Sequence, residues 1–215
     1  TTPRATRWFV DQNSGLVVLA DGFAGRTLAR LEVGAPGSVL DIAQSPNGVA
    51  VLDRSAASSR SVDTTALRLG PPRSVSLLAA TDAVVEIGPA GLVAVDPRTS
   101  EAVLLPAGGD PVSFEVRPVG VGDATRIAPD GAVWTLAGGN LTRVTTAESQ
   151  PIVSGLTAAS FTFVGSAPLL LDRNRARARL GDGRWVALPD GVAPSEIVLQ
   201  EPGPVADCGW VGADD

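Results

Sequence analysis

The stretch Pro46-Asn47-Gly48-Val49-Ala50-Val51-Leu52-Asp53 joins a tight turn to an apolar run that ends in an aspartate. Proline presets φ at the first central position of a turn, asparagine tolerates the second, and glycine accepts the positive φ that lets a hairpin resume. The run after the turn is apolar without alternation, as in a strand that is buried on both faces. The stretch therefore predicts a hairpin whose returning strand lies inside the protein.

Related stretches recur along the chain, and their turns lie at residues 15, 48, 91, 131, 167 and 203. The spacings of 33, 43, 40, 36 and 36 residues average about 38, which is close to one blade of a β-propeller. In such a ring the apolar runs would be inner strands, covered by neighbouring blades. We therefore predict an all-β fold, a β-propeller of about six short blades in a single domain over residues 1–215. The aligned stretches are residues 13–19, 46–52, 89–95, 129–134, 165–171 and 201–205.

A two-layer β-sandwich is the competing all-β fold. A sandwich predicts alternating strands and frequent turns but no repeat of the whole unit, so the repeat favours the propeller. The sixth repeat supplies residues 195–200, a turn at 201–203 and one further strand, so its outer two strands are missing. Open strand edges invite other chains to pair. We expect another polypeptide to complete the last blade: a second copy, a different protein or a downstream fragment.

Composition excludes several classes of protein. The net charge of −6 argues against a nucleic-acid-binding protein, because such proteins need a basic footprint on the phosphates. No apolar run reaches the roughly 18 residues of a membrane span. Cys208 is the single cysteine and has no disulfide partner in the chain. The chain starts at Thr1 with no basic-then-apolar leader, so we expect any signal sequence to have been removed already.

The repeats resemble those of the NHL and YVTN class of β-propellers, in which a turn ending in Asp-Gly or Asn-Gly precedes an apolar strand and an Asp. More narrowly, residues 8–11, 16–22 and 49–54 are similar to propeller regions of large secreted actinobacterial proteins that also carry fibronectin type III modules. The abundance of Arg, Ala, Gly and Val also resembles the composition of proteins from high-GC actinobacteria. This resemblance implies a binding or scaffolding role outside the bacterial cytoplasm, secreted or at the cell surface.

The residue types that are missing limit the chemistry. The chain holds no His and no Lys, so it has neither a Ser-His-Asp triad nor a Ser-Lys pair. One Cys and no His make a zinc site improbable. Propeller sialidases use a Tyr nucleophile, and this chain has no Tyr. We expect no cofactor and no catalytic residue.

Paired carboxylates remain an open alternative, because two of them suffice for glycoside hydrolysis and carboxylates with backbone oxygens can bind calcium. The weak metal candidates are the aspartates that close the apolar strand in four repeats. An Asp at a strand end also accepts hydrogen bonds from backbone N–H groups of the following turn, which explains its recurrence without a ligand. We favour this structural role for Asp21, Asp53, Asp96 and Asp172.

The most localised charge feature is a run of arginines spaced two apart, followed by one more beyond a Gly-Asp-Gly turn. If residues 176–180 form a strand, Arg177 and Arg179 share a solvent-exposed face. Such a stripe could dock an anionic partner, because arginine suits bidentate contacts with carboxylate or phosphate. It could also be a solvated outer strand whose charges deter aggregation, and this second interpretation is favoured. The possible partner-binding residues are Arg173, Arg175, Arg177, Arg179 and Arg184.

Two functions follow from these observations. The first is a binding or scaffolding module that recognises a protein or glycan partner across one face of the propeller. The second is a carboxylate-dependent hydrolase or lactonase, with or without calcium. Three or more carboxylates lining a central channel would favour the enzyme, but the apolar runs supply almost none. We therefore expect the binding module.

Overall fold

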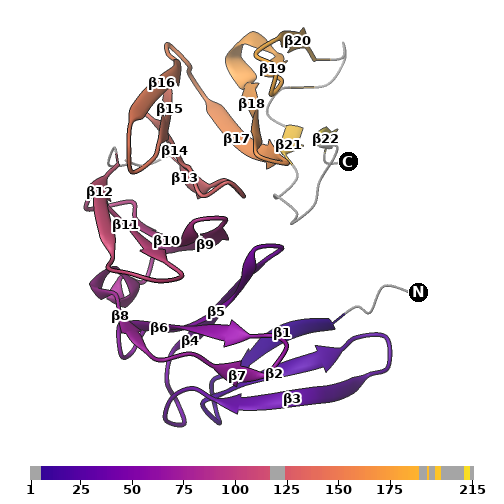
Figure 1. Ribbon diagram of the computed structural model, residues 1–215. Helices are drawn as coiled ribbons and strands as arrows, with labels where there is room; N and C mark the ends of the chain where they lie inside the picture. The colour runs from indigo at the N-terminus through magenta and orange to yellow at the C-terminus, as the bar shows by residue number, and fades with distance from the viewer. Residues whose placement is uncertain (1–5, 117–123, 189–192, 194–196, 200–210, 214–215) are drawn as a thin grey trace.

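The computed structural model describes residues 6–116, 124–188, 193, 197–199 and 211–213. These residues contain no α-helix, and their strands form six antiparallel sheets arranged around a common centre (Figure 1). The first sheet holds β1 (Thr6–Asp11), β2 (Leu16–Asp21) and β3 (Arg26–Glu32). The second holds β4 (Leu40–Ser45), β5 (Gly48–Asp53), β6 (Ser58–Asp63), β7 (Arg68–Leu69) and β8 (Arg73–Ser74).

The other four sheets follow in chain order, and two short 3₁₀ helices interrupt the strands. The third sheet holds β9 (Val84–Gly88), β10 (Gly91–Asp96), β11 (Glu101–Pro106) and β12 (Val112–Glu115); the fourth holds β13 (Ala124–Ile127), β14 (Val133–Ala137), β15 (Asn140–Val144) and β16 (Ser149–Val153). The fifth holds β17 (Ala159–Val164), β18 (Ala167–Asp172), β19 (Arg177–Arg179) and β20 (Trp185–Ala187), and the sixth holds β21 (Ile197–Leu199) and β22 (Val211–Ala213). The 3₁₀ helices are η1 (Ser76–Ala79) and η2 (Arg173–Arg175).

The predicted hairpins are present in the first five sheets. In each of them the first two strands pair across one of the turns that the repeat identified, such as residues 46–47 between β4 and β5 and residues 89–90 between β9 and β10. Gly48 and Gly91 begin the returning strands with φ of 153° and 138°, which a residue with a Cβ rarely adopts. The sixth predicted turn, at 203, and Cys208 lie outside the described residues.

The apolar runs are not the innermost strands, and this prediction is wrong. Each sheet has its first strand at one edge, and that strand contacts the first strand of the next sheet, from β1 through β4, β9, β13 and β17 to β21. The apolar runs form the second strands, one step farther from the centre, as Figure 1 shows for β10, β14 and β18. A second strand has neighbouring sheets over both faces, whereas a first strand also borders the central space.

The core lies between consecutive sheets, and each second strand serves two interfaces at once. In β10, Leu92 and Ala94 pack towards the second sheet, whereas Val93 and Val95 pack towards the fourth. In β5, Val51 packs towards the first sheet, and Leu52 packs towards the third. Successive side chains of a strand point to opposite faces. An apolar run is therefore what a strand between two sheets favours, and this part of the prediction is confirmed for β5, β10 and β18. The second strand of the fourth sheet, β14, is also buried but includes Thr135, whose hydroxyl has no hydrogen-bond partner among the described residues.

The first strand of the first sheet runs in the opposite direction to that of the second sheet. The backbone N–H of Trp8 donates to the Gln44 side chain, and the Gln12 side chain donates to the carbonyl of Leu40, so β1 passes β4 in antiparallel sense. The turns of the second, third and fourth sheets instead meet at one end. There the Asn47 amide donates to the carbonyls of Ile87 (3.1 Å) and Pro129 (3.3 Å). The first turn, at residues 12–15, therefore lies at the opposite end of the sheets from the turn at residues 46–47.

In the sixth sheet, β21 pairs with β22. The strand that the sixth repeat predicts directly after the turn at 201–203 lies outside the described residues. On the first sheet, the face that points away from the second sheet carries Phe9, whose side chain is 51% exposed. That another polypeptide completes the last blade, next to the sixth sheet, stays a prediction.

The third and fourth sheets are in close backbone contact at two glycines, Gly88 and Gly131. A Cβ on Gly88 would lie 2.7 Å from the Cα of Gly131, a distance that real structures do not tolerate. We predict that Gly88→Ala pushes the two sheets apart and lowers the free energy of unfolding by about 1–3 kcal/mol. Chemical denaturation measures the loss. Gly108→Ala is the matched control, because a Cβ there has no neighbour within 4 Å, and equal stabilities of the two variants would contradict the close contact.

Candidate functional site

A hollow of about 790 Å³ lies where the first strands of the sheets converge. We call it the central hollow. Side chains from five sheets line it, among them Trp8, Gln44, Glu86, Ile127 and Phe163. Such a space, bounded by several elements and mixing apolar walls with a few polar groups, is the usual form of a ligand site.

Local structure explains which side chains reach the central hollow. The turn after β4 brings Ser45 and Pro46 to its rim, and the reversed first sheet brings the start of β1, Thr6 to Trp8, to the same place. Gln44 is held by Trp8, because its side-chain oxygen accepts from the Trp8 N–H (3.3 Å) and its nitrogen donates to the Trp8 carbonyl (3.4 Å). The polar rim is thus fixed to the strands that carry it.

Among the described residues, two charged ones line the central hollow, Arg7 and Glu86. Burial raises the pKa of the Glu86 carboxyl above its usual value of 4.5, and the hydrogen bond that it accepts from the Ile87 N–H (3.0 Å) offsets only part of this effect. Glu86 therefore holds a proton more readily than an exposed glutamate. In its neutral form it can donate a hydrogen bond to a ligand, and in its charged form it can bind a cation.

The sequence prediction did not include the residues of the central hollow. One signal was present for Glu86, which is the only charged residue in the apolar strand β9. No sequence signal identified Gln44 or Trp8, because their position depends on the reversal of the first sheet.

Three of the four strand-end aspartates have the structural role that was favoured. The Asp21 carboxylate accepts from the N–H groups of Phe23 and Ala24 (3.0 Å each), Asp53 accepts from Ala56 (3.0 Å), and Asp96 accepts from Arg98 (2.9 Å). All three are nearly buried, and each belongs to a different sheet. Within the part of the chain that the structure describes, no group of three or more acidic, His or Cys side chains could hold a metal ion.

The fourth aspartate, Asp172, binds arginines instead of backbone N–H groups. It is fully buried, and its Oδ2 accepts from Arg175 (3.1 Å) and from Arg177 (3.2 Å). The Arg177 guanidinium also lies over the ring of Trp185, 3.9 Å from the centroid. Asp172 Oδ1 has no hydrogen-bond partner among the described residues. A buried carboxylate is costly unless it is paired, so these arginines offset the cost of burying it.

The arginine run does not form a continuous exposed stripe. Arg173 and Arg175 belong to η2, and Ala176 adopts the left-handed conformation (φ 45°) that separates them from Arg177 and Arg179 in β19. Arg177 and Arg179 lie on one face, opposite the buried Ala178, as predicted. Both are half-buried, so the prediction that they are solvent-exposed is wrong. Two of the four arginines, Arg175 and Arg177, pair with the buried Asp172, which the sequence alone did not reveal.

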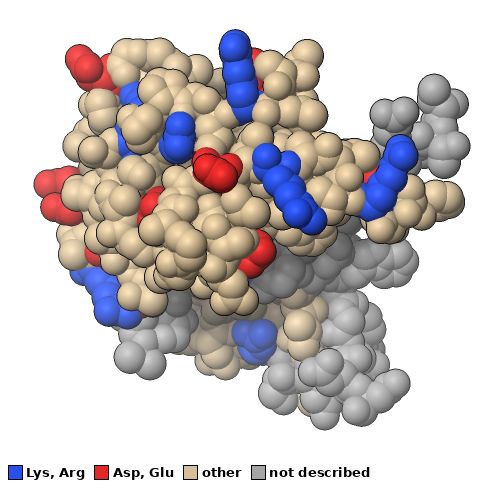
Figure 2. Space-filling model, turned by 90° about the horizontal axis from the view of Figure 1, so that it is seen from below, with Lys and Arg blue, Asp and Glu red and all other residues tan. Residues whose placement is uncertain are grey.

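The last arginine of the group, Arg184, is exposed and lies 3.6 Å from the carboxylate of Asp182. Figure 2 shows that, on the face seen from below, arginines and acidic side chains are interspersed among uncharged residues. That face has no extended surface of one sign. Docking of an anionic partner to the arginines stays a prediction.

Comparison with solved structures identifies the arrangement of the sheets. Virginiamycin B lyase from Staphylococcus aureus superposes with a TM-score of 0.57 and 14% identity, over 96% of this chain and 73% of the lyase. The chain is a β-propeller. The dihydro-heme d1 dehydrogenase NirN matches with a TM-score of 0.57 and 15% identity, over 93% of this chain and 47% of NirN. Hsv2 from Kluyveromyces lactis matches with a TM-score of 0.52 and 13% identity, over 83% of this chain and 57% of Hsv2.

These identities show the fold of the propeller and nothing of its activity. No protein-family model matches the chain, and no match was found among curated proteins. The NHL, YVTN and actinobacterial resemblance is thus supported only as far as the propeller fold. None of the helices in the described residues has the length and apolar character needed to cross a bilayer.

The contacts of Asp172 with two arginines give a prediction of stability. Arg177→Ala should lower the free energy of unfolding by about 2–3 kcal/mol, because it removes one of two partners of a buried carboxylate together with the contact to Trp185. Arg184→Ala, on the surface, should change it by no more than about 0.5 kcal/mol. Urea denaturation compares the two variants. If Arg177→Ala left the free energy of unfolding unchanged, the burial of Asp172 would not depend on Arg177.

Glu86 gives a prediction of pH dependence. Because the folded state raises the pKa of this carboxyl, its protonated form favours folding at low pH, and this contribution is lost as the pH rises through the folded-state pKa. Glu86→Gln should therefore raise the melting temperature at pH 7 by about 2 °C, and the gain should shrink below pH 4.5. Thermal denaturation from pH 3.5 to 8 measures it. Glu32→Gln, at an exposed position, is the control, and a gain that does not vary with pH would rule out burial of Glu86 as the cause.

Proposed function

We propose that this propeller is a binding module, secreted or at the cell surface, that recognises a protein or glycan partner through the central hollow. The observation that carries the proposal is the convergence of five sheets on one space with mixed lining. Hydroxyl groups of Thr6 and Thr64 offer hydrogen bonds, and the hollow also has apolar walls. Partners with many hydroxyl or amide groups fit such a lining.

The lining of the hollow favours binding over carboxylate catalysis. Hydrolysis of a glycoside by two carboxylates needs both groups beside the same bond. Glu86 is the single carboxylate among the described residues that line the hollow, and the four strand-end aspartates lie in four different sheets. We therefore propose a module without catalytic activity of this kind.

The likeness to virginiamycin B lyase does not favour lyase activity. A variant of that lyase in which a histidine is replaced by alanine is catalytically inactive, and it was solved with quinupristin. This chain has no histidine. One fold can serve proteins of different activity, so a binding role without that chemistry is compatible with the comparison.

A screen of the purified protein on glycan and peptide arrays tests the proposal. The strongest ligand is then titrated by calorimetry against the wild type and two variants. Thr64→Arg places a large side chain at the rim of the central hollow and should weaken binding about tenfold or more. Thr27→Arg makes the same change at an exposed position of β3, away from the lining, and should leave the affinity unchanged.

Three results would contradict the proposal. If the protein binds nothing on either array, it is not a module of this kind. Equal affinities of Thr64→Arg and Thr27→Arg would place the binding site elsewhere. Turnover of an array glycan by the wild type would favour the carboxylate-dependent enzyme.

A further inference from the structure

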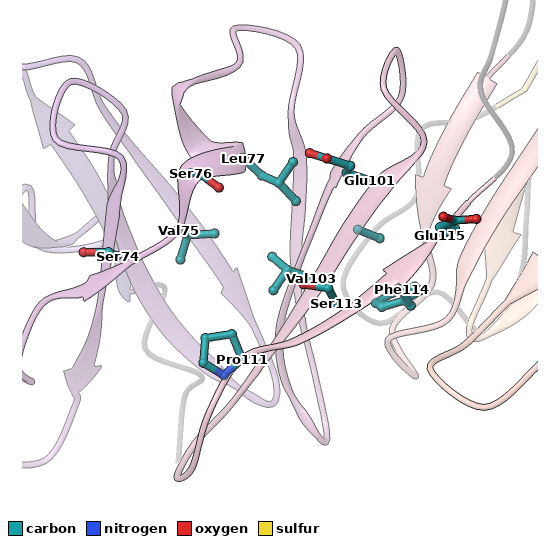
Figure 3. Close-up of a pocket in the computed structure, with 11 residues that line it drawn as sticks. Ser74, Val75, Ser76, Leu77, Glu101, Val103, Pro111, Ser113, Phe114 and Glu115 are labelled. Atoms are coloured by element: carbon teal, nitrogen blue, oxygen red, sulfur yellow. The ribbon is translucent and has the colours of Figure 1, made fainter.

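A second hollow, of about 520 Å³, lies between η1 and the outer half of the third sheet, as Figure 3 shows. We call it the η1 groove. Val75 and Leu77 line it on the side of the second sheet, and Val103, Ser113 and Glu101 line it on the side of the third. It is separate from the central hollow, with which it shares no lining residue.

The groove exists because the second sheet ends early. Its outer strand β8 has two residues and pairs with β6 only through Arg73 and Ser74. The chain then turns into η1, where Leu78 is fully buried in the core and Leu77 is left at the groove. The outer part of the third sheet therefore has one face without a strand over it.

That uncovered face carries two glutamates at directly opposed positions of neighbouring strands. Glu101 on β11 is the direct cross-strand partner of Glu115 on β12, and Val103 is the partner of Ser113, so all four side chains share one face. Like charges at directly opposed positions are destabilising. Neither glutamate has an ion-pair or hydrogen-bond partner among the described residues. In Figure 3 the Glu101 carboxylate points towards Leu77 across the groove.

The arginine next to the groove, Arg73, does not neutralise the two glutamates. Arg73, next to the groove residue Ser74, donates to the backbone carbonyls of Pro106 and Gly109 instead. The groove thus combines uncompensated negative charge at its rim with an apolar floor that includes Val75, 5% exposed, and Val103, 7% exposed. A ligand that satisfies both features has a cationic group next to an aliphatic one.

We propose that the η1 groove binds a peptide segment of another protein in which an arginine or lysine stands beside an aliphatic residue. The cationic group lies between Glu101 and Glu115 and relieves their repulsion. The aliphatic side chain, with the methylene stem of the basic residue, covers Val75, Leu77 and Val103. The partner is thus bound by charge complementarity at the rim and by apolar burial at the floor.

Fluorescence anisotropy with two labelled peptides tests the proposal. One probe alternates valine with arginine, and the other alternates valine with glutamate. The wild type should bind the valine–arginine peptide and not the valine–glutamate peptide, and added salt should weaken this binding. Glu101→Gln with Glu115→Gln keeps the shape of the groove, removes both charges and should weaken binding about fivefold or more.

Two further variants keep the test decisive. Glu32→Gln with Glu148→Gln makes the same change in net charge at exposed positions elsewhere and should bind like the wild type. Ser113→Trp fills the groove from an exposed position and should abolish binding while the circular dichroism spectrum stays unchanged.

The proposal is overturned if the wild type binds neither peptide, or if the Glu101 and Glu115 double variant binds as well as its control. It is also overturned if calcium alone raises the melting temperature through these two glutamates while the peptide does not bind, since the groove would then be a cation site. A failure of binding at the central hollow would not affect any of these outcomes.

Discussion

The structure depends on one constraint. In a sheet that lies between two neighbouring sheets, the second strand must bury both of its faces. Successive side chains of such a strand belong to different interfaces, so a single polar residue would lie between two apolar layers. Burying an unpaired polar group costs more free energy than one apolar contact supplies. The apolar runs that end at Asp53, Asp96 and Asp172 satisfy this constraint, and the core is divided by it into layers between consecutive sheets.

The sequence was sufficient to predict the fold because this constraint leaves a pattern that repeats. Turns with proline, asparagine or aspartate, and glycine mark the hairpins, and the apolar runs after them mark the strands with two neighbours. The order of the strands from the centre outwards was not predictable from burial. First strands such as β9 border the central space, and their side chains are less buried than those of β10. Apolar character therefore identifies the most covered strand, which is not the innermost one.

The candidate site was less predictable than the fold, for physical reasons. Asp21, Asp53 and Asp96 interact with the backbone a few residues ahead, and such local contacts can be inferred from position in the sequence. The partners of Asp172 are also close in sequence, but their geometry depends on the left-handed turn at Ala176. The central hollow combines residues from five sheets, including Trp8 and Phe163, which are far apart in the chain. Only the packing of whole sheets brings such residues together.

The reversed first sheet limits how the repeat can be used in protein engineering. Across the first interface, Val17 and Leu19 face Val49 and Val51, which occupy the same positions relative to the closing aspartates. Across the next interface, Ala50 and Leu52 face Leu92 and Ala94, which occupy different positions. A consensus repeat averaged over all the aligned stretches would combine two incompatible packing rules. An idealised propeller built from this chain should take its consensus from the second to the fifth sheets and keep the first as a separate terminal unit.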